Sequence, residues 1–349
     1  MEKFSQYRDR GSGIAPFFPV TTSTAALALP LHIFLFTIRI PLLLTVALSY
    51  YLFFGWLPIR SLGKKAALWL ILGIPGIWWV DLQIDGVKRG SLAKQHLSRL
   101  PHPGTIIASS FTSPIDSLYL AAIFDPIFTV SYPNTPLVRP VSLLSSILRA
   151  FLSPRLLPSD KDAAALMTLA QLRAKHPDRI IVVLPECTTS NGRGILALSP
   201  SLTTAPAGTK VFPVSLRYTP PDITSPLPGI RSGIAWLWRL CSRPTHCIRV
   251  RIGAAIDPAD MRAAVSPRGL SSSWVDVAEE TSPARRSSAQ AKPMKGDRLL
   301  VGQSGLSKDQ ERFLERVGED LARLGRVKRV GLGAKEKVDF LRLWEKRGR

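Results

Sequence analysis

The chain has 349 residues, enough for one large core or two modest ones, and its apolar fraction of 46% is too high for a disordered basic protein. Its 46 Lys and Arg outnumber 25 Asp and Glu, and the formal net charge of +21 favours partners that carry negative charge, such as phosphates, anionic lipid or nucleic acid. The three cysteines show no CxxC spacing and no histidine pair nearby, which argues against a metal site or a disulfide framework and makes a reducing compartment the default.

After an N-terminal tail at 1–30, residues 31–85 are predicted to associate with a membrane. The segment 40–58 contains no charged residue. As a helix it would be about 28 Å long, close to the roughly 30 Å of a bilayer's hydrocarbon core. A second apolar run at 66–80 is shorter and is broken by a Pro-Gly pair. A buried core helix and a cleaved signal peptide are the alternatives, although a signal peptide would lie nearer the start.

The charges between the two apolar runs bear on the membrane topology. Arg60, Lys64 and Lys65 lie there, and positive charge prefers the cytosolic side of a membrane, as does the very basic remainder of the chain. A helical hairpin that dips into the cytosolic leaflet satisfies both conditions. One full span followed by a re-entrant helix is the competing arrangement, and it would put the N-terminus across the membrane.

Residues 95–262 are predicted to form a layered α/β domain, because strand-like and helix-like segments alternate along them. The β-branched run IIVVL at 180–184 is typical of a central, parallel strand. The last strand alternates apolar and basic residues, as an edge or half-exposed strand does. We therefore expect an α/β fold with a mixed, largely parallel sheet, preceded by the membrane hairpin. Its strands are expected at 105–109, 180–184, 209–218 and 247–256, and its helices at 116–124 and 158–177.

Two further segments follow this domain. Residues 266–306 are rich in Ser, Ala, Pro and charge without periodicity, which predicts a disordered insertion. Residues 307–349 are expected to form basic helices, the first of which opens on a capping-box pattern at Ser307 and Gln310. The basic tail beyond it either lies along an anionic surface or packs on the domain as a solvated helix.

Two polar turns follow predicted strands. The first is SSFTSPID at 109–116, and the second is PECTTSNGRG at 185–194. The carboxyl ends of parallel strands are where α/β proteins place their ligands. Small hydroxyls, exposed amides and an arginine suit a phosphate or another polar headgroup. We therefore expect both turns to converge at one edge of the sheet and to bind a phosphorylated ligand there.

Together these stretches resemble three motif blocks of the glycerolipid acyltransferase superfamily, which includes lysophosphatidic acid and glycerol-3-phosphate acyltransferases. The first block, N-H-x-x-x-x-D, is similar to SFTSPID at 110–116, and the third, P-E-G-T, to PECT at 185–188. The fourth block, V-x-P-V followed by a strand, is similar to VFPVSLRY at 211–218. The resemblance covers roughly 100–256 and the N-terminal hairpin, and it is strongest to fungal membrane-bound lysophosphatidic acid acyltransferases.

The resemblance implies a mechanism and a set of site residues. In the family a histidine removes a proton from an acceptor hydroxyl, which attacks the thioester of acyl-CoA, and an aspartate orients the histidine. Asp116 matches that catalytic aspartate. Acyl-CoA is then a co-substrate, and no cofactor or metal is implied. The positions implied to bind substrate are Ser110, Phe111, Thr112, Ser113, Glu186, Cys187, Thr188, Thr189, Asn191 and Arg193, with Arg139, or else Arg149, as the basic residue of the second block.

The chain departs from the family pattern at two positions. Phe111 occupies the place of the histidine and cannot accept a proton, and Cys187 replaces a glycine where the backbone would approach closely. The histidines at 102, 176 and 246 precede strands, so we expect them near the opposite ends of the strands, on the order of 20 Å away. Asp116, the acceptor's own phosphate or a mobile base is then left to take the proton.

Each site residue has a plainer interpretation. Asp116 is also a typical helix N-cap residue, Glu186 a solvated loop acid and Arg193 a surface arginine. Cys187 fits a small structural residue better than a nucleophile. Phe111 is expected in the core or as a wall of the acyl or acceptor pocket.

Three functions remain open at this point. The first is an acyl-CoA-dependent acyltransferase that acts on a lysophospholipid, with lysophosphatidic acid as the expected acceptor. The second is a family member that binds lipid or acyl-CoA without turnover, because the general base is missing. The third, a nucleic-acid binder, is disfavoured by the uncharged segment. The resemblance further implies a membrane location, at the endoplasmic reticulum or on lipid droplets, with the acyltransferase domain in the cytosol.

Overall fold

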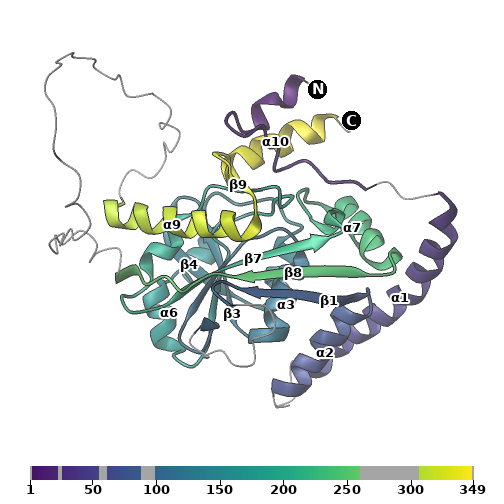
Figure 1. The fold of residues 1–349 in the computed structure, drawn as a ribbon, viewed down its shortest axis with the longest axis horizontal. Helices are drawn as coiled ribbons and strands as arrows, with labels where there is room; N and C mark the ends of the chain where they lie inside the picture. The colour runs from purple at the N-terminus through teal and green to yellow at the C-terminus, as the bar shows by residue number, and fades with distance from the viewer. Residues whose placement is uncertain (1, 23–25, 55–60, 88–98, 260–305, 348–349) are drawn as a thin grey trace, which may run out of the picture.

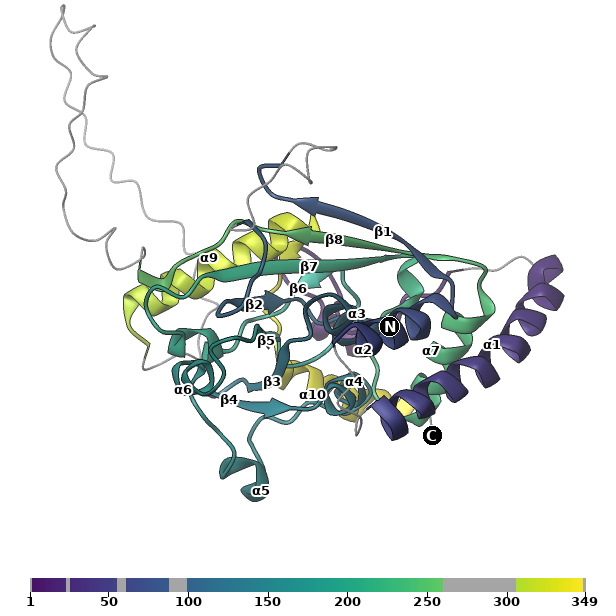
Figure 2. The ribbon, with the colours of Figure 1, turned by 90° about the horizontal axis from the view of Figure 1, so that it is seen from below.

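A mixed seven-stranded sheet forms the centre of the molecule. The computed structural model describes residues 2–22, 26–54, 61–87, 99–259 and 306–347. The strand order is β1-β8-β7-β2-β5-β3-β4, and Figure 2 shows β1 and β4 at opposite edges. The pairs β3–β4 and β7–β8 are antiparallel and the other four are parallel, which confirms the predicted fold class. The strands are β1 (Ile77–Ile84), β2 (Ile106–Ser109), β3 (Ile127–Tyr132), β4 (Thr135–Val141), β5 (Ile181–Val183), β7 (Val211–Thr219) and β8 (His246–Ile252), with a separate small sheet of β6 (Gly194–Ile195) and β9 (Lys328–Arg329).

Helices cover both faces of this sheet, and each face has its own hydrophobic core. Figure 1 shows α9 on one side of the sheet and α1 and α2 on the other. Buried residues of α2 and α3 form one core with the sheet, and α6 and α9 supply the other. The helices are α1 (Leu29–Ser49), α2 (Ser61–Gly73), α3 (Pro114–Phe124), α4 (Leu143–Arg149), α5 (Asp160–Ala163), α6 (Leu169–Lys175), α7 (Ile230–Ser242), α9 (Lys308–Gly325) and α10 (Ala334–Arg347), and the short helical turns are η1 (Glu2–Tyr7), η2 (Ala26–Ala28), η3 (Tyr50–Phe54), η6 (Pro200–Thr204) and η7 (Pro221–Ile223).

The prediction of a single helix at 158–177 is wrong, because the chain forms two helices there, α5 and α6, with a break between them. Met167 lies in the break, where its backbone exchanges two hydrogen bonds of 2.9 Å with Val138 of edge strand β4. Thr168 and Gln171 then form a capping box that starts α6. Helical periodicity continued through the break, but an exposed strand edge offered Met167 backbone partners that a helix would have denied it.

The second apolar run is not one helix either. Helix α2 ends at Gly73, and Gly76 takes a left-handed turn with φ of 90°. A side chain at Gly76 would collide with the carbonyl of Pro244, so only glycine fits the turn. Residues Ile77–Ile84 then form β1, which pairs in parallel with β8. The expectation of membrane helix up to residue 80 is therefore wrong, and β8 lies inside the sheet rather than at its edge, although its side chains alternate in burial as expected.

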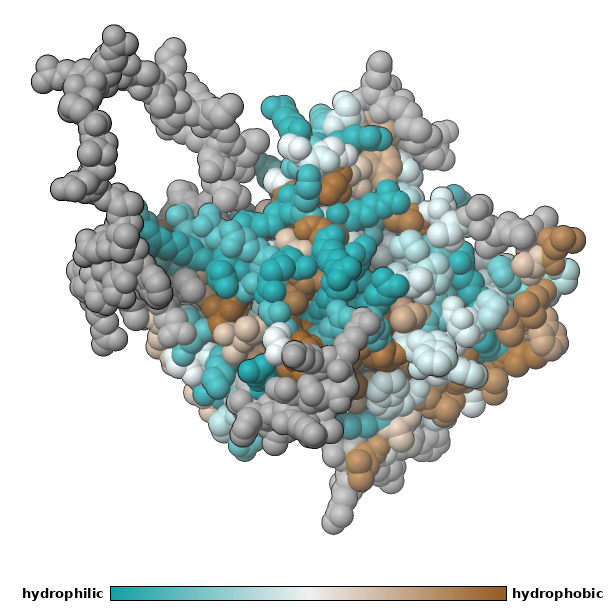
Figure 3. Space-filling model, in the orientation of Figure 1, coloured by the Kyte–Doolittle hydropathy of each residue, from teal (hydrophilic) through white to brown (hydrophobic). Residues whose placement is uncertain are grey.

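The first apolar helix begins earlier than the predicted segment 40–58. In the described part of the chain, the stretch Leu29–Leu52 is the one helix long and apolar enough to cross a membrane, with a mean hydropathy of 2.1. None of the residues of α1 is buried, and its apolar surface is visible at the right-hand side of Figure 3. A core helix of a soluble protein would be mostly buried, so α1 does not fit that alternative. Residues 55–60 lie outside the described ranges.

Arg39 holds α1 to the rest of the domain. It lies in the middle of the apolar helix, and its guanidinium donates hydrogen bonds to the carbonyl oxygens of Pro75 at 3.2 Å, Cys241 at 3.3 Å and Pro244 at 2.9 Å, and also to that of Arg243. These carbonyls belong to the turn before β1 and to the end of α7. A charged side chain at this place satisfies backbone acceptors that would otherwise lack a partner.

The two ends of the chain pack against each other, and the described part of the N-terminal segment, residues 2–22, takes part in this contact. Phe17 and Phe340 are fully buried in a third hydrophobic cluster together with Tyr7, Leu196 and Leu341. Figure 1 shows the N- and C-termini side by side. Helix α9 begins with the predicted capping box at Ser307. The disordered insertion predicted at 266–306 falls, apart from its last residue, outside the described ranges.

Candidate active site

The two polar turns meet at one edge of the sheet, as predicted. The backbone N–H of Phe111 donates to the Glu186 carboxylate at 3.2 Å, and the N–H of Ser190 donates to the carbonyl of Phe111 at 3.0 Å. The turns follow β2 and β5, which are adjacent and parallel, so both strands deliver their carboxyl ends to the same place. Residues 75 positions apart in the chain are thereby in direct contact.

Asp116 is placed as a buried helix-capping residue. Its side chain is fully buried, and one oxygen accepts hydrogen bonds from the N–H groups of Thr112 at 2.6 Å and Ser113 at 2.9 Å. Ser113 in turn caps α3, which completes a capping box. Burial raises the pKa of Asp116 to about 6, although these hydrogen bonds oppose the shift. The carboxylate therefore stabilises the turn that carries Phe111.

Tyr218 was not predicted as a site residue, yet it forms a hydrogen bond with the second carboxylate oxygen of Asp116. Its hydroxyl donates to Asp116 Oδ1 from the end of β7. Tyr218 is buried, and burial together with the nearby carboxylate raises the pKa of its hydroxyl well above its usual value. The phenol thus stays protonated and does not supply a base. The sequence placed Tyr218 in a strand of the same sheet, but its contact with Asp116 depends on β7 lying next to β2, which the sequence did not show.

Glu186 is the residue that ties the loop to the first turn. Its side chain is 1% exposed, and its second oxygen accepts from the N–H of Leu196 at 3.2 Å. Burial raises the pKa of Glu186 to about 8, the two backbone donors oppose this shift, and Asp116 adds to it. The interpretation of Glu186 as a solvated loop acid is therefore wrong. It is a buried carboxylate that spans two segments.

A small cavity of about 30 Å³ lies beside Phe111 and the start of the second turn, and β3 and α4 supply much of its remaining wall. It has room for roughly two water molecules. The ring of Phe111 lines it, together with Thr188, Cys187 and Arg149. Arg149 of α4 is therefore at the cavity, and its guanidinium also lies 6.0 Å from the centre of the Tyr132 ring. The cavity thus combines one cation with hydroxyl groups at the place where the two motif turns meet.

Cys187 adopts a left-handed backbone conformation with φ of 58°. Glycine favours this region, which explains why a glycine suits the position in the family pattern. Burial raises the pKa of the Cys187 thiol to about 12. A thiol that stays protonated is a poor nucleophile, so the geometry favours a structural role for this side chain.

Three of the predicted binding residues lie away from the cavity. Arg139 on β4 forms an ion pair with Asp162 at 2.6 Å. Asn191 donates to carbonyl oxygens of the N-terminal segment at 2.8 and 2.9 Å, and Arg193 is exposed beside it. The other predicted residues, Ser110, Thr112, Ser113, Thr188 and Thr189, are buried around the junction of the two turns.

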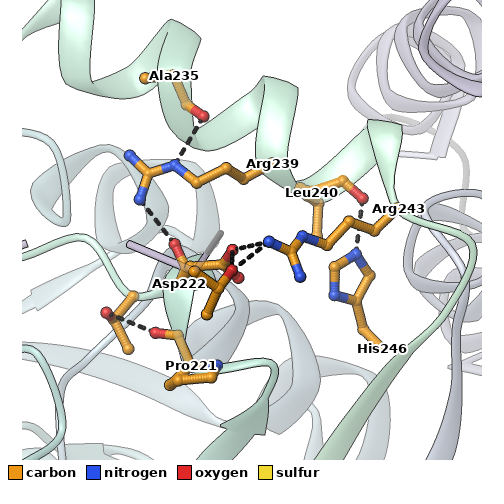
Figure 4. A network of polar contacts seen from close by, with 9 residues as sticks. Pro221, Asp222, Ala235, Arg239, Leu240, Arg243 and His246 are labelled. Carbon is orange, nitrogen blue, oxygen red and sulfur yellow. Dashed lines mark hydrogen bonds and ion pairs between the residues drawn. The ribbon is translucent and has the colours of Figure 1, made fainter. Parts of the chain in front are cut away.

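A third loop, which the sequence did not indicate, connects both turns. Ser225 donates its N–H to the carbonyl of Thr112 at 2.9 Å and accepts from the Thr189 hydroxyl at 2.6 Å. Figure 4 shows how the loop is held: buried Asp222 forms an ion pair with Arg243, and Arg239 donates to its carbonyl at 2.9 Å. Arg239 lies on α7 and Arg243 directly follows its last residue, so this helix positions the loop.

The expectation that His246 lies at the edge of the sheet opposite the motif turns is wrong. His246 begins β8, and because β8 is antiparallel to β7, it lies at the same edge as the turns and not at the opposite one. Its Nε2 lies 2.8 Å from the carbonyl of Leu240 and its side chain is 1% exposed (Figure 4). The ring is therefore fixed to the end of α7. Of the described histidines, none lines the cavity at Phe111.

The arrangement can bind an anionic group and hold a hydroxyl, but it presents no ready proton acceptor at the cavity. Backbone donors engage both oxygens of Glu186. In Asp116, backbone donors engage one oxygen and the Tyr218 hydroxyl engages the other. Within the described ranges, no three His, Cys, Asp or Glu side chains gather in a way that could hold a metal ion. The chemistry available to these residues is therefore binding, orientation and electrostatic stabilisation.

Comparisons with known proteins agree with the motif resemblance. No family model matches the chain. The chain is 28% identical over 239 residues to a Schizosaccharomyces pombe protein provisionally named lysophosphatidic acid:oleoyl-CoA acyltransferase, a match that covers 66% of this chain and 78% of that protein. It is 25% identical over 230 residues to lysophosphatidic acid:oleoyl-CoA acyltransferase 1 of Saccharomyces cerevisiae, with 61% and 70% covered. The chain is thus similar to fungal lysophosphatidic acid acyltransferases, as its three motif blocks predicted.

Proposed function

We propose that this protein is an acyl-CoA-dependent O-acyltransferase that converts lysophosphatidic acid to phosphatidic acid. The observation that carries the proposal is the junction of the two motif turns, where the Glu186 carboxylate accepts from the Phe111 N–H beside a cavity lined by Arg149. In the reaction, the acceptor hydroxyl attacks the thioester carbonyl carbon and the carbon–sulfur bond breaks. The coenzyme A thiolate leaves and finally takes up the proton that the hydroxyl gave up.

Arg149 is the residue that would hold the phosphate of the acceptor. A guanidinium binds phosphate through two parallel hydrogen bonds, and it keeps its charge even when it is partly buried. Burial lowers the pKa of Arg149 from its usual value, and the neighbouring Arg139 adds to this. The negative charge of a bound phosphate would favour the protonated guanidinium and so raise the pKa of Arg149 again. This chemistry favours a phosphorylated lysolipid over a neutral acceptor.

An apolar cavity of about 220 Å³ supports a site for the acyl chain. It begins at Pro114 and Ile115, which belong to the motif turn and open α3, and α1, α2, α4 and α7 supply most of the rest of its wall. A ligand cavity with an apolar wall and few polar groups suits an alkyl chain. A thioester held at the motif turn would therefore have a place for its hydrocarbon beside the helix α3.

The membrane is the expected source of the lipid acceptor, and the domain would face it with α1. Exposed large apolar side chains gather on α1 and the neighbouring helix α7, namely Leu29, Leu31, Ile33, Phe34, Ile38, Leu42, Leu44 and Leu48 on α1 and Ile230 and Ile234 on α7. Such a surface binds the interfacial region of a membrane, and the net charge of +21 would attract anionic lipid. We place the protein on the cytosolic face of the endoplasmic reticulum or on lipid droplets.

Because no histidine of the described residues lines the cavity, the substrate's own phosphate is the proton acceptor that we propose. Asp116 is unsuitable because its two oxygens are occupied by Tyr218, Thr112 and Ser113. The phosphate of lysophosphatidic acid is close to the reacting hydroxyl in the same molecule, and its second pKa near 6 leaves it able to accept a proton. General base catalysis contributes about 10²- to 10⁴-fold, so a weaker acceptor slows the reaction without abolishing it.

A second candidate function follows from Phe111, whose ring fills the place of the base and is 4% exposed. In this alternative the protein binds acyl-CoA or lysolipid and does not transfer the acyl group. The two candidates are separated by one assay, in which purified protein is incubated with labelled oleoyl-CoA and a panel of lysolipids. Transfer that disappears in Glu186→Ala supports the acyltransferase. Tight acyl-CoA binding without transfer, at protein concentrations up to those of the substrate, supports the binding protein.

A further inference from the structure

Lys337 is a buried cation that comes to the motif loop from the far end of the chain. It lies on α10 and is 1% exposed. Its Nζ donates hydrogen bonds to the carbonyl oxygen of Thr189 at 2.6 Å and to the Thr189 hydroxyl oxygen at 2.9 Å. Thr189 also donates to Ser225, so the ammonium group anchors the point where the motif loop meets the third loop. Lysine is almost never fully buried unless it is paired, so this placement requires a reason.

The rest of α10 is well fixed above the loop. Phe340 and Leu341 are buried in the cluster that also contains Leu196, which follows the motif loop. The backbone between α9 and α10 pairs with the same segment, because Val330 donates to the carbonyl of Ile195 at 2.9 Å and Ala197 donates to that of Leu332 at 3.0 Å. The C-terminal segment therefore packs over the motif loop through side chains and backbone hydrogen bonds, and Lys337 makes the charged contact with the loop.

Lys337 faces an acidic environment. The charged groups that act on Glu186 are Asp116 of α3, which raises its pKa, and Lys337 of α10, which lowers it. Burial lowers the pKa of Lys337 to about 7, and Glu186 opposes this shift. Two buried carboxylates and one buried cation thus share this part of the site. Without the cation, Glu186 would be ionised only at a larger cost.

We propose that Lys337 is a positioning residue of the motif loop: its ammonium group fixes Thr189, so that the C-terminal helix completes the site. The role of Lys337 in acyl transfer rests on the function proposed above, whereas its role in ordering the loop does not. A charged hydrogen bond to a buried backbone carbonyl is among the stronger single contacts in a protein.

The test compares three variants of the full chain with the parent. Lys337→Met removes the charge and the hydrogen bonds but keeps the length of the apolar stem, and Lys337→Gln keeps a donor for Thr189 without the charge. Lys335→Met is the matched control, because Lys335 is exposed on the same helix. Hydrogen–deuterium exchange of a peptide that covers residues 186–197 reports on the loop, and exchange in β2 is the internal reference for global folding. Acyl transfer from oleoyl-CoA to lysophosphatidic acid is measured across pH.

For Lys337→Met we expect loop exchange that is about 10- to 100-fold faster, while β2 is unchanged. We also expect acyl transfer to be slower across the pH range, because the loop is no longer held at Thr189. Lys337→Gln should slow loop exchange again and restore part of the transfer, and Lys335→Met should match the parent.

Two results would overturn the proposal. Loop exchange that is the same in Lys337→Met as in the parent means that Lys337 does not position the loop, whether or not the parent transfers acyl groups. Loop exchange in Lys337→Gln that is as fast as in Lys337→Met rejects the role of the donor to Thr189. A parent without any transfer would instead contradict the acyltransferase function, and the exchange experiment would still decide the role of Lys337.

Discussion

Restoring a histidine at position 111 tests how this site handles its proton. A histidine there would lie five residues before Asp116, as in the family pattern, and inherit backbone bonds to Glu186 and Ser190. Asp116, however, is already engaged, because the Tyr218 hydroxyl occupies Oδ1. Phe111→His alone should therefore gain little, since nothing orients the new imidazole or stabilises its protonated form. Phe111→His combined with Tyr218→Phe frees that oxygen for the histidine.

The expected magnitudes follow from these contacts. A positioned general base is worth about 10²- to 10⁴-fold in rate, so the double variant should exceed the parent by about 100-fold or more. The single Phe111→His variant should gain less than about tenfold. Tyr218→Phe alone should gain nothing and should lower the free energy of unfolding by about 1–3 kcal/mol, because a buried carboxylate oxygen loses its partner.

Initial rates of transfer from labelled oleoyl-CoA to lysophosphatidic acid, measured with all four proteins, give the coupling between the two positions. Phe111→Asn with and without Tyr218→Phe controls for polarity at position 111, because an amide of similar size is not a base. A gain in Phe111→His that equals the gain in the double variant would refute the reasoning, since Tyr218 would then not be what prevents the aspartate from orienting a histidine.

Three further predictions concern phosphate binding, pH and the apolar helix. Arg149→Gln should raise KM for lysophosphatidic acid about tenfold or more without changing KM for oleoyl-CoA. Arg155→Gln, at an exposed side chain, should change neither KM. If steady-state assays give Arg149→Gln and the parent the same KM for lysophosphatidic acid, Arg149 does not bind the phosphate. Because burial raises the pKa of Glu186 to about 8, the native state keeps a proton that the unfolded state releases from about pH 4 upward, so the free energy of unfolding should fall as the pH rises toward 8. Glu186→Gln should flatten this dependence in denaturant titrations at pH 5 and pH 8.5, and an unchanged slope would contradict the burial effect. Arg39→Leu should lower the free energy of unfolding in detergent by about 1–3 kcal/mol, because its contacts with backbone carbonyls are lost. Thr37→Leu on the same helix should not lower it. An Arg39→Leu protein as stable as the parent would show that these contacts do not hold α1.

Local sequence patterns determined the elements that carry the site. The β-branched run before Pro185 predicted β5, and TIIAS predicted β2, because strands buried on both faces need continuous apolar residues. Two parallel strands must bring their following turns to one edge, so the meeting of residue 111 with residue 186 could be foreseen. The sequence also shows directly that position 111 holds a phenylalanine, which cannot act as a base.

Only the tertiary structure decided which side chains complete the site. Tyr218 and Lys337 lie 102 and 148 residues from the groups they contact, Asp116 and Thr189. In the sequence Tyr218 is one aromatic residue of a strand and Lys337 one lysine of a basic tail. The choice of Arg149 over Arg139 likewise rests on an ion pair with Asp162, which engages Arg139 elsewhere. Such contacts follow from how strands are ordered and how the chain ends are packed, and no local spacing encodes them, because burial and pairing are properties of the folded molecule.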